Sequence, residues 1–204
     1  MLEDQAMSVQ EAAAVAQDAR VRARRELVIS APLVYTAWGL VWFLGYGAMW
    51  LSARGQHPYR GPSGVSIAAV FVLAGFAAAA VLFIAHKATA GIDGQSVRYR
   101  RIIITTWVTG YLILLLVQAG ISRSVSTRAL AFVALAGPLV LAGLVYILAS
   151  VLGRNRPAFA LGAWLVIAGA CCAWLAPADI LAMCSLAGGG GFLVIAIIET
   201  RLRT

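Results

Sequence analysis

Charged residues are scarce in this chain, and they are missing from the middle of its long apolar segments. They make up 12% of the 204 residues, about half the share usual in soluble proteins, whereas hydrophobic residues make up 62%. No Asp, Glu, Lys or Arg falls near the centre of an apolar segment. Ion-coupled carriers and proton relays usually keep such a residue inside the bilayer despite its cost, so we do not expect that class of protein.

The few histidines and cysteines form none of the usual metal or haem patterns. His57 and His86 are expected at opposite membrane faces, whereas haem binding in a bundle requires paired, inward-facing ligands. Cys171, Cys172 and Cys184 lack CxxC or zinc spacing. We therefore expect no cofactor, no metal site and no enzymatic activity. Cys172 and Cys184 are interpreted as buried thiols, and a bond between them stays open.

Six apolar segments of about 20 residues are each long enough to cross a hydrocarbon core about 30 Å thick. Pro32 and Pro157 are expected in the first turns of the first and fifth helices, where a missing amide hydrogen does no harm. The sequence thus predicts an all-α integral membrane protein in which residues 31–204 form one domain, a six-transmembrane-helix bundle. The predicted spans are 31–52, 64–86, 102–121, 129–151, 157–176 and 179–199.

Residues 1–30 are more polar and are predicted to form a separate amphipathic helix at the cytoplasmic membrane surface. Ser8 and Glu11 have the spacing of a capping box, and four arginines follow near the end of the segment. These arginines are typical either of a topology signal or of an interfacial helix attracted to anionic lipid. The segment lacks the pattern of a signal peptide, so no processing is expected.

Basic residues between the apolar segments predict the orientation of the bundle. Twelve fall on the side of the two termini, and four fall on the other: Arg54, Arg60, Arg123 and Arg128. The positive-inside rule places both termini in the cytoplasm. Because topology explains the net charge of +8, no nucleic-acid partner is expected. Nearly all the basic residues are arginine, which indicates a GC-rich bacterial genome and hence a bacterial plasma membrane.

A run of four glycines lies near the middle of the sixth predicted span: Gly188, Gly189, Gly190 and Gly191. Gly45 and Gly47 are expected at a similar depth in the first span. In lipid, glycine lets helices approach closely, so the run predicts tight packing against the first or fifth helix or across a subunit interface. In that case Gly189→Leu or Gly190→Leu should disrupt assembly. The alternative is a broken helix that exposes carbonyls to a substrate.

Gln118 is the most polar side chain expected inside a span, and Tyr111 lies seven residues earlier on the same side of its helix. With aromatic residues of other spans they predict a polar or aromatic cavity, although interhelical hydrogen bonding also explains such residues. The candidate lining residues are Gln118, Tyr111, Tyr46, Tyr35, Trp42 and Tyr146.

The longest internal loop, residues 87–101, is expected in the cytoplasm and ends in Arg98, Arg100 and Arg101, a candidate docking site for a partner. A leading amphipathic helix, six spans and this loop together resemble the layout of ABC-2 type permease subunits, which implies a separate ATPase as partner. The connection 177–179 is too short for the outer re-entrant helices common in that family.

We therefore predict a small multi-pass permease or channel-like transport subunit, dependent or not on a partner ATPase and acting in a homo-oligomer or a hetero-complex. The alternative is a structural or regulatory subunit, without transport activity, that binds another membrane protein or membrane lipid. The substrate is not indicated by any motif.

Overall fold

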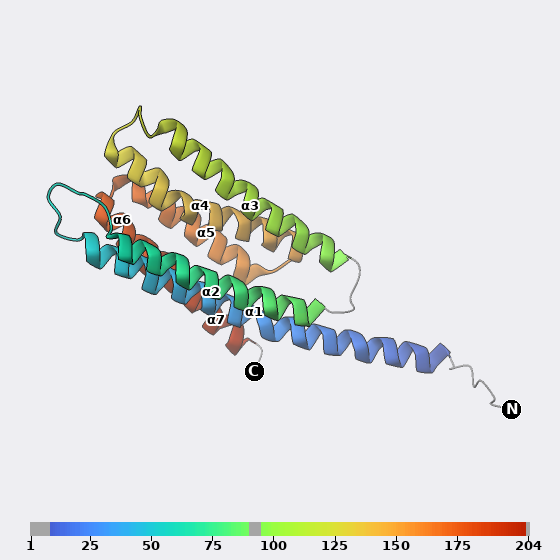
Figure 1. Ribbon diagram of the computed structural model, residues 1–204. Helices are drawn as coiled ribbons and strands as arrows, with labels where there is room; N and C mark the ends of the chain where they lie inside the picture. Colours follow the sequence, from blue (N-terminus) through green and yellow to red (C-terminus); the bar gives the residue numbers. More distant parts are fainter. Residues whose placement is uncertain (1–8, 90–94, 203–204) are drawn as a thin grey trace.

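The computed structural model describes residues 9–89 and 95–202, apart from the side chains of residues 85–100, of Thr127 and of most of residues 9–30. All the regular structure in this part of the chain is helical (Figure 1). The elements are α1 (Val9–Ala53), α2 (Gly64–Thr89), α3 (Gln95–Ile121), α4 (Thr127–Gly153), α5 (Arg156–Cys171), the 3₁₀ turn η1 (Cys172–Trp174), α6 (Pro177–Met183), the π-helical turn η2 (Cys184–Gly189) and α7 (Gly190–Arg201).

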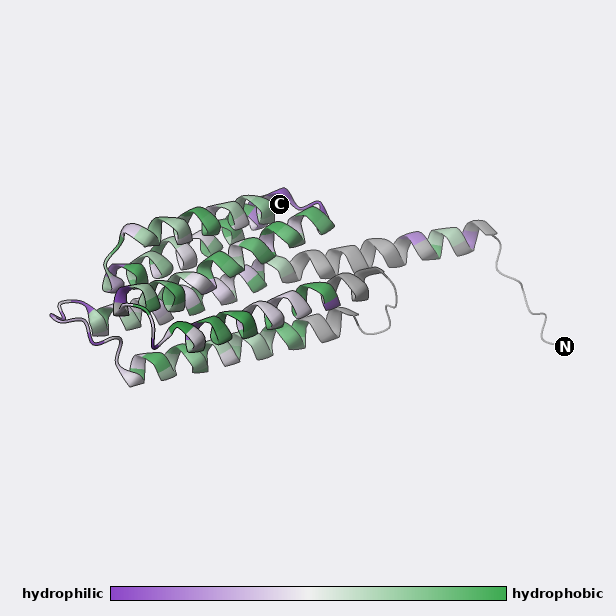
Figure 2. Ribbon diagram, turned by 90° about the horizontal axis from the view of Figure 1, so that it is seen from above, coloured by the Kyte–Doolittle hydropathy of each residue, from purple (hydrophilic) through white to green (hydrophobic). Residues whose placement is uncertain are grey.

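Five of the described helices are long and apolar enough to cross a membrane. They correspond to the second to sixth predicted spans: α2, α3, α4, α5 with η1, and the continuous helix α6–η2–α7. The first predicted span is the second half of α1, which is rich in Trp and Tyr. These residues are less hydrophobic than the leucines and alanines of the other helices. Hydrophobic residues follow the helices along their length, and hydrophilic residues gather in the loops (Figure 2).

The predicted boundary at Pro32 is wrong. α1 continues without interruption from Val9 to Ala53, so Pro32 lies inside the helix and not in its first turn. Proline is tolerated inside membrane helices where neighbouring groups compensate the disturbed backbone. The Thr36 hydroxyl donates to the Pro32 carbonyl at 2.9 Å, which is a bond back to the residue one turn earlier and does not replace the amide donor that Pro32 lacks. The expectation for Pro157 is confirmed: it lies in the first turn of α5, after Asn155 as N-cap.

The predicted cytoplasmic loop 87–101 is also shorter than expected. Residues 87–89 continue α2, and residues 95–101 form the first two turns of α3. Arg98, Arg100 and Arg101 are therefore helical. The glycine-rich turn predicted around Asp93 lies outside the described residues.

The helices form an arc in which α2 packs on α1, α1 packs on α6–η2–α7, α7 packs on α5, α5 on α4 and α4 on α3. α2 and α3 occupy the two ends of this arc and make no comparable contact with each other in the described part of the chain. The core lies inside the arc. Its fully buried side chains include Leu139 of α4, Leu165 of α5 and Phe192 of α7.

The most extensive helix contact in the described part of the chain is between α4 and α5. A Cβ atom added to Gly143 would lie 2.7 Å from the Gly162 carbonyl oxygen, and one added to Gly162 would lie 2.7 Å from the Gly143 carbonyl oxygen. The two backbones therefore meet directly, as small residues allow in membrane bundles. This contact fixes the half of the arc that carries α3.

Candidate functional site: a π-helical glycine segment and an aromatic groove

The helix that contains the glycine run continues through all four glycines. Its backbone changes from a π-helical turn to an α-helix within the run. Cys184–Gly189 form the π-helical turn η2, and α7 begins at Gly190. Gly189 and Gly190 both have right-handed helical dihedrals, with φ of −60° at each. The helix is therefore not unwound at the glycines. A π turn inserts a residue into the helix and is frequent at functional sites.

Three of the four glycines lie against neighbouring helices. A Cβ on Gly188 would lie 2.7 Å from the Trp42 ring, and one on Gly189 would lie 2.7 Å from the Phe43 Cα. A Cβ on Gly191 would lie 2.9 Å from the Trp164 ring of α5. Gly190 has open space in this direction. The run thus lies where α1 and α5 both approach this helix.

Gly45 and Gly47 of α1, which were predicted at a similar depth, face two different helices. Gly47 faces the glycine-run helix, because its Cβ would lie 3.3 Å from the Ser185 hydroxyl oxygen. Gly45 faces α2 instead, where its Cβ would lie 2.9 Å from a methyl group of Val70. Only Gly47 belongs to the contact around η2.

Hydrogen bonds from side chains connect η2 to three neighbouring helices. The Ser185 hydroxyl donates to the Phe43 carbonyl of α1 at 2.7 Å, and the Cys184 thiol donates to the Leu135 carbonyl of α4 at 3.3 Å. The Trp164 indole of α5 donates to the Ala187 carbonyl at 2.9 Å. Ser185 and Trp164 were not predicted from the sequence, since a lone serine and an aromatic residue near a span end carry no distinctive spacing.

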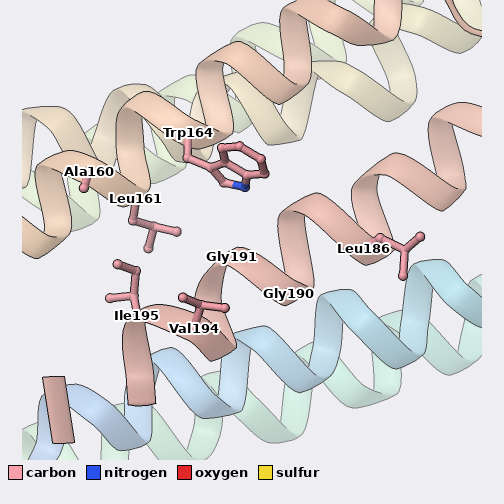
Figure 3. Close-up of a pocket in the computed structure, with 8 residues that line it drawn as sticks. All are labelled: Ala160, Leu161, Trp164, Leu186, Gly190, Gly191, Val194 and Ile195. Carbon is pink, nitrogen blue, oxygen red and sulfur yellow. The ribbon is translucent and has the colours of Figure 1, made fainter. Parts of the chain in front are cut away.

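A shallow cleft of about 430 Å³ lies beside this segment, between α5 and α7 (Figure 3). Trp164 lies on its α5 side and Leu186 on the side of η2, while Gly190 and Gly191 form part of its floor. The lining carries apolar side chains apart from the indole nitrogen, which is already bonded to η2. The cleft therefore has little to orient a polar ligand.

Phe192 connects the glycine segment to a second, larger hollow. It is buried, directly follows Gly191, and packs against Trp42 with ring centroids 6.0 Å apart and edge-on against Tyr146 at 5.3 Å. Aromatic pairs at such distances add about 0.5–1.5 kcal/mol each beyond the apolar area that they bury. The close approach at Gly188 and Gly189 brings α7 near enough to α1 for this cluster to form.

This aromatic cluster is part of the floor of a groove of about 470 Å³ between α2 and α3. The walls are apolar side chains of these two helices, which sit at the ends of the arc, so the groove is partly open to the surroundings of the bundle. We call it the aromatic groove. Its lining residues are Val34, Trp38, Trp42, Ala78, Val81, Leu82, Ile103, Ile104, Trp107, Val108, Tyr111, Val145, Tyr146, Ala149 and Phe192.

The structure brings together only part of the predicted cavity. Trp42, Tyr111 and Tyr146 line the aromatic groove. Tyr35 packs behind Tyr146, with ring centroids 5.8 Å apart, and Tyr46 packs on Trp42 at 5.1 Å, but neither lines the groove. The remaining candidate, Gln118, is half-buried farther along α3 and also lies outside the lining.

Three aromatic residues of the groove, Trp38, Trp107 and Phe192, were not predicted from the sequence. Trp107 stacks on Tyr111, four residues later, with ring centroids 5.7 Å apart and planes at 16°. That spacing places both rings on one face of α3, so it was a usable signal. Phe192 carried none, because its direction depends on the π turn before it.

The cysteines are free thiols. Cys172 and Cys184 are buried, and their thiols donate to the carbonyls of Ala168 and Leu135, whereas Cys171 is exposed. Among the described residues, no three His, Cys, Asp or Glu side chains gather in a way that could hold a metal ion.

The function must be inferred from these sites alone, since no protein-family model, curated protein or solved structure matches this chain.

Proposed function

We propose that this chain is a six-span membrane protein that binds one hydrocarbon chain of a membrane lipid in the aromatic groove. The observation that carries the proposal is the groove itself, an apolar hollow with an aromatic floor that lies between two helices at the ends of an arc. Of the functions that the sequence left open, it supports the alternative of a lipid-binding subunit.

The proposed topology places the second half of α1, residues 31–53, across the bilayer as the sixth span. Its support is packing: this half lies alongside α2, α6 and α7, which are parts of apolar helices long enough to cross a membrane. The excess of basic residues on the side of the two termini supports a cytoplasmic location for both. With this topology the groove opens sideways toward the lipid chains.

The size of the groove favours a lipid chain over a helix of another protein. An α-helix with its side chains is about 10–12 Å wide, whereas the floor of the groove is reached between apolar side chains of α2 and α3. A hydrocarbon chain is much thinner and could follow the groove between α2 and α3. The volume also lies within the range of about 300–1,000 Å³ found for small-molecule pockets.

The lining favours an apolar ligand held by shape. Trp38, Trp42 and Trp107 provide large, rigid surfaces, and Ala78 and Ala149 leave space between them. Burying an apolar chain against such surfaces gains dispersion contacts over its whole length. A permease or channel-like role, with or without an ATPase, stays a prediction. If the bound lipid is moved across the bilayer, it would be the substrate of that transport.

The test is the amount of lipid that stays with the purified protein. Ala78→Phe places a ring in the groove, whereas Ala80→Phe makes the same change at an exposed position of α2 outside the lining. After detergent washing, wild type and Ala80→Phe should retain about one phospholipid per chain by mass spectrometry, and Ala78→Phe should lose it. Equal retention in the two variants would refute the proposal. A changed oligomeric state of Ala78→Phe with unchanged lipid would point to a second copy as occupant.

A further inference from the structure

The aromatic groove lies in the half of the bundle near the chain termini. Its α3 residues, from Ile103 to Tyr111, belong to the first half of the apolar span Arg101–Ile121, and its α2 residues, from Ala78 to Leu82, belong to the second half of the apolar span Gly64–Ile84. The end of the bundle next to this half carries the start of α3 and the end of α7 (Figure 1). The groove therefore leads toward an end of the bundle with basic residues.

The register of α3 shows which arginines lie on the same face of the helix as the residues that line the groove. Residues 103, 104, 107, 108 and 111 line it and form one stripe of the helix. At about 100° per residue, position 100 lies close to the centre of this stripe, one turn beyond Ile104. Position 101 lies at its edge, and Arg101 is exposed. Position 98 lies on the opposite face of α3.

We propose that the groove selects an anionic phospholipid of the leaflet next to the chain termini, whose headgroup phosphate binds Arg100 and Arg101 while one hydrocarbon chain occupies the groove. The inference rests on the proposed function. Its support is charge complementarity at one end of an apolar groove. Guanidinium groups bind phosphate oxygens through paired, charge-assisted hydrogen bonds, and arginines that flank a membrane segment attract anionic lipid.

Native mass spectrometry of the full chain can compare phosphatidylglycerol with phosphatidylcholine carrying the same two acyl chains. The wild-type protein should bind phosphatidylglycerol more tightly. A basic side chain near an anionic lipid surface contributes about 1 kcal/mol, or about fivefold in affinity. The variant Arg100→Gln/Arg101→Gln should therefore bind phosphatidylglycerol about 30-fold more weakly, with phosphatidylcholine binding unchanged. Arg98→Gln, on the opposite face, should change either affinity less than twofold.

The outcomes separate the inference from the proposed function. If Ala78→Phe abolishes binding of both lipids and the double arginine variant keeps the wild-type preference, the groove binds chains but the headgroup site is wrong. If Arg98→Gln weakens phosphatidylglycerol binding as much as the double variant does, the attraction is diffuse and the inference fails. If Ala78→Phe leaves both affinities unchanged, both proposals fail. Circular dichroism and thermal unfolding of each variant show that it is folded.

Discussion

Two adjacent glycines in the same helix should respond in opposite ways to the same small substitution. Gly189 and Gly190 share helical dihedrals that alanine adopts freely, so neither needs glycine for its backbone. They differ only in space. A Cβ on Gly189 would lie 2.7 Å from the Phe43 Cα and closer still to the Phe43 amide nitrogen, whereas a Cβ on Gly190 would have no heavy atom within 4 Å.

The magnitude follows from these distances. Ordinary contacts of a Cβ begin at about 3.4 Å, so Gly189→Ala requires the α1 backbone to move away by at least 0.7 Å. Overpacking of this kind costs about 1–3 kcal/mol, and the Ser185 bond to the Phe43 carbonyl would be strained with it. Gly190→Ala should be neutral or stabilising by up to about 1 kcal/mol, because alanine is the better helix former.

Reversible unfolding of the purified variants in mixed detergent micelles measures both free energies against wild type. Gly189→Ala should unfold at lower denaturant than wild type, and Gly190→Ala should not. Equal stabilities of the two variants would refute the packing described for η2 and α7. The result also separates two positions that the sequence treated alike, since it predicted that leucine at either one disrupts assembly.

Two further substitutions test the contacts that position the site. Ser185→Ala removes a hydrogen bond to the α1 backbone and should destabilise the fold by about 0.6 kcal/mol, a typical value between membrane helices. Ser122→Ala, which loses only an exposed bond to the carbonyl of Ala119 at the end of α3, should have no effect in the same unfolding assay. Gly143→Ala forces apart the α4 and α5 backbones and should cost about 1–3 kcal/mol, while Gly75→Ala, with open space around it, should not. Equal effects within either pair would contradict the assigned contact.

The sequence predicted most of the fold because long apolar segments can satisfy their backbone hydrogen bonds in lipid only as helices or closed barrels. The limits of α4, of α5 with η1, and of the continuous helix α6–η2–α7 lie within a few residues of the prediction. The continuity of α1 was missed because Pro32 and a change in composition were interpreted as a helix start. The start of α3 was missed because its first turns are polar, although a helix can project beyond the apolar region.

The site was harder to predict, since helices that are apolar on all sides carry little periodic information about their neighbours. Gln118 was chosen for its polarity alone, and polarity does not give the direction of a side chain. Trp42, Tyr111 and Tyr146 were chosen for their aromatic character, and they do share the groove. Their common position depends on the order of the helices around the arc, which only the three-dimensional structure provides.

A photoreactive phospholipid tests the central claim most directly. With a diazirine at the middle of one acyl chain, irradiation of the reconstituted protein and peptide mass spectrometry will locate the chain. The account predicts adducts concentrated on the groove-lining residues Leu82, Ile104 and Val108, well above those on Phe76 and Leu116, which are exposed outside the groove. Adducts spread evenly over all the exposed apolar residues would contradict it.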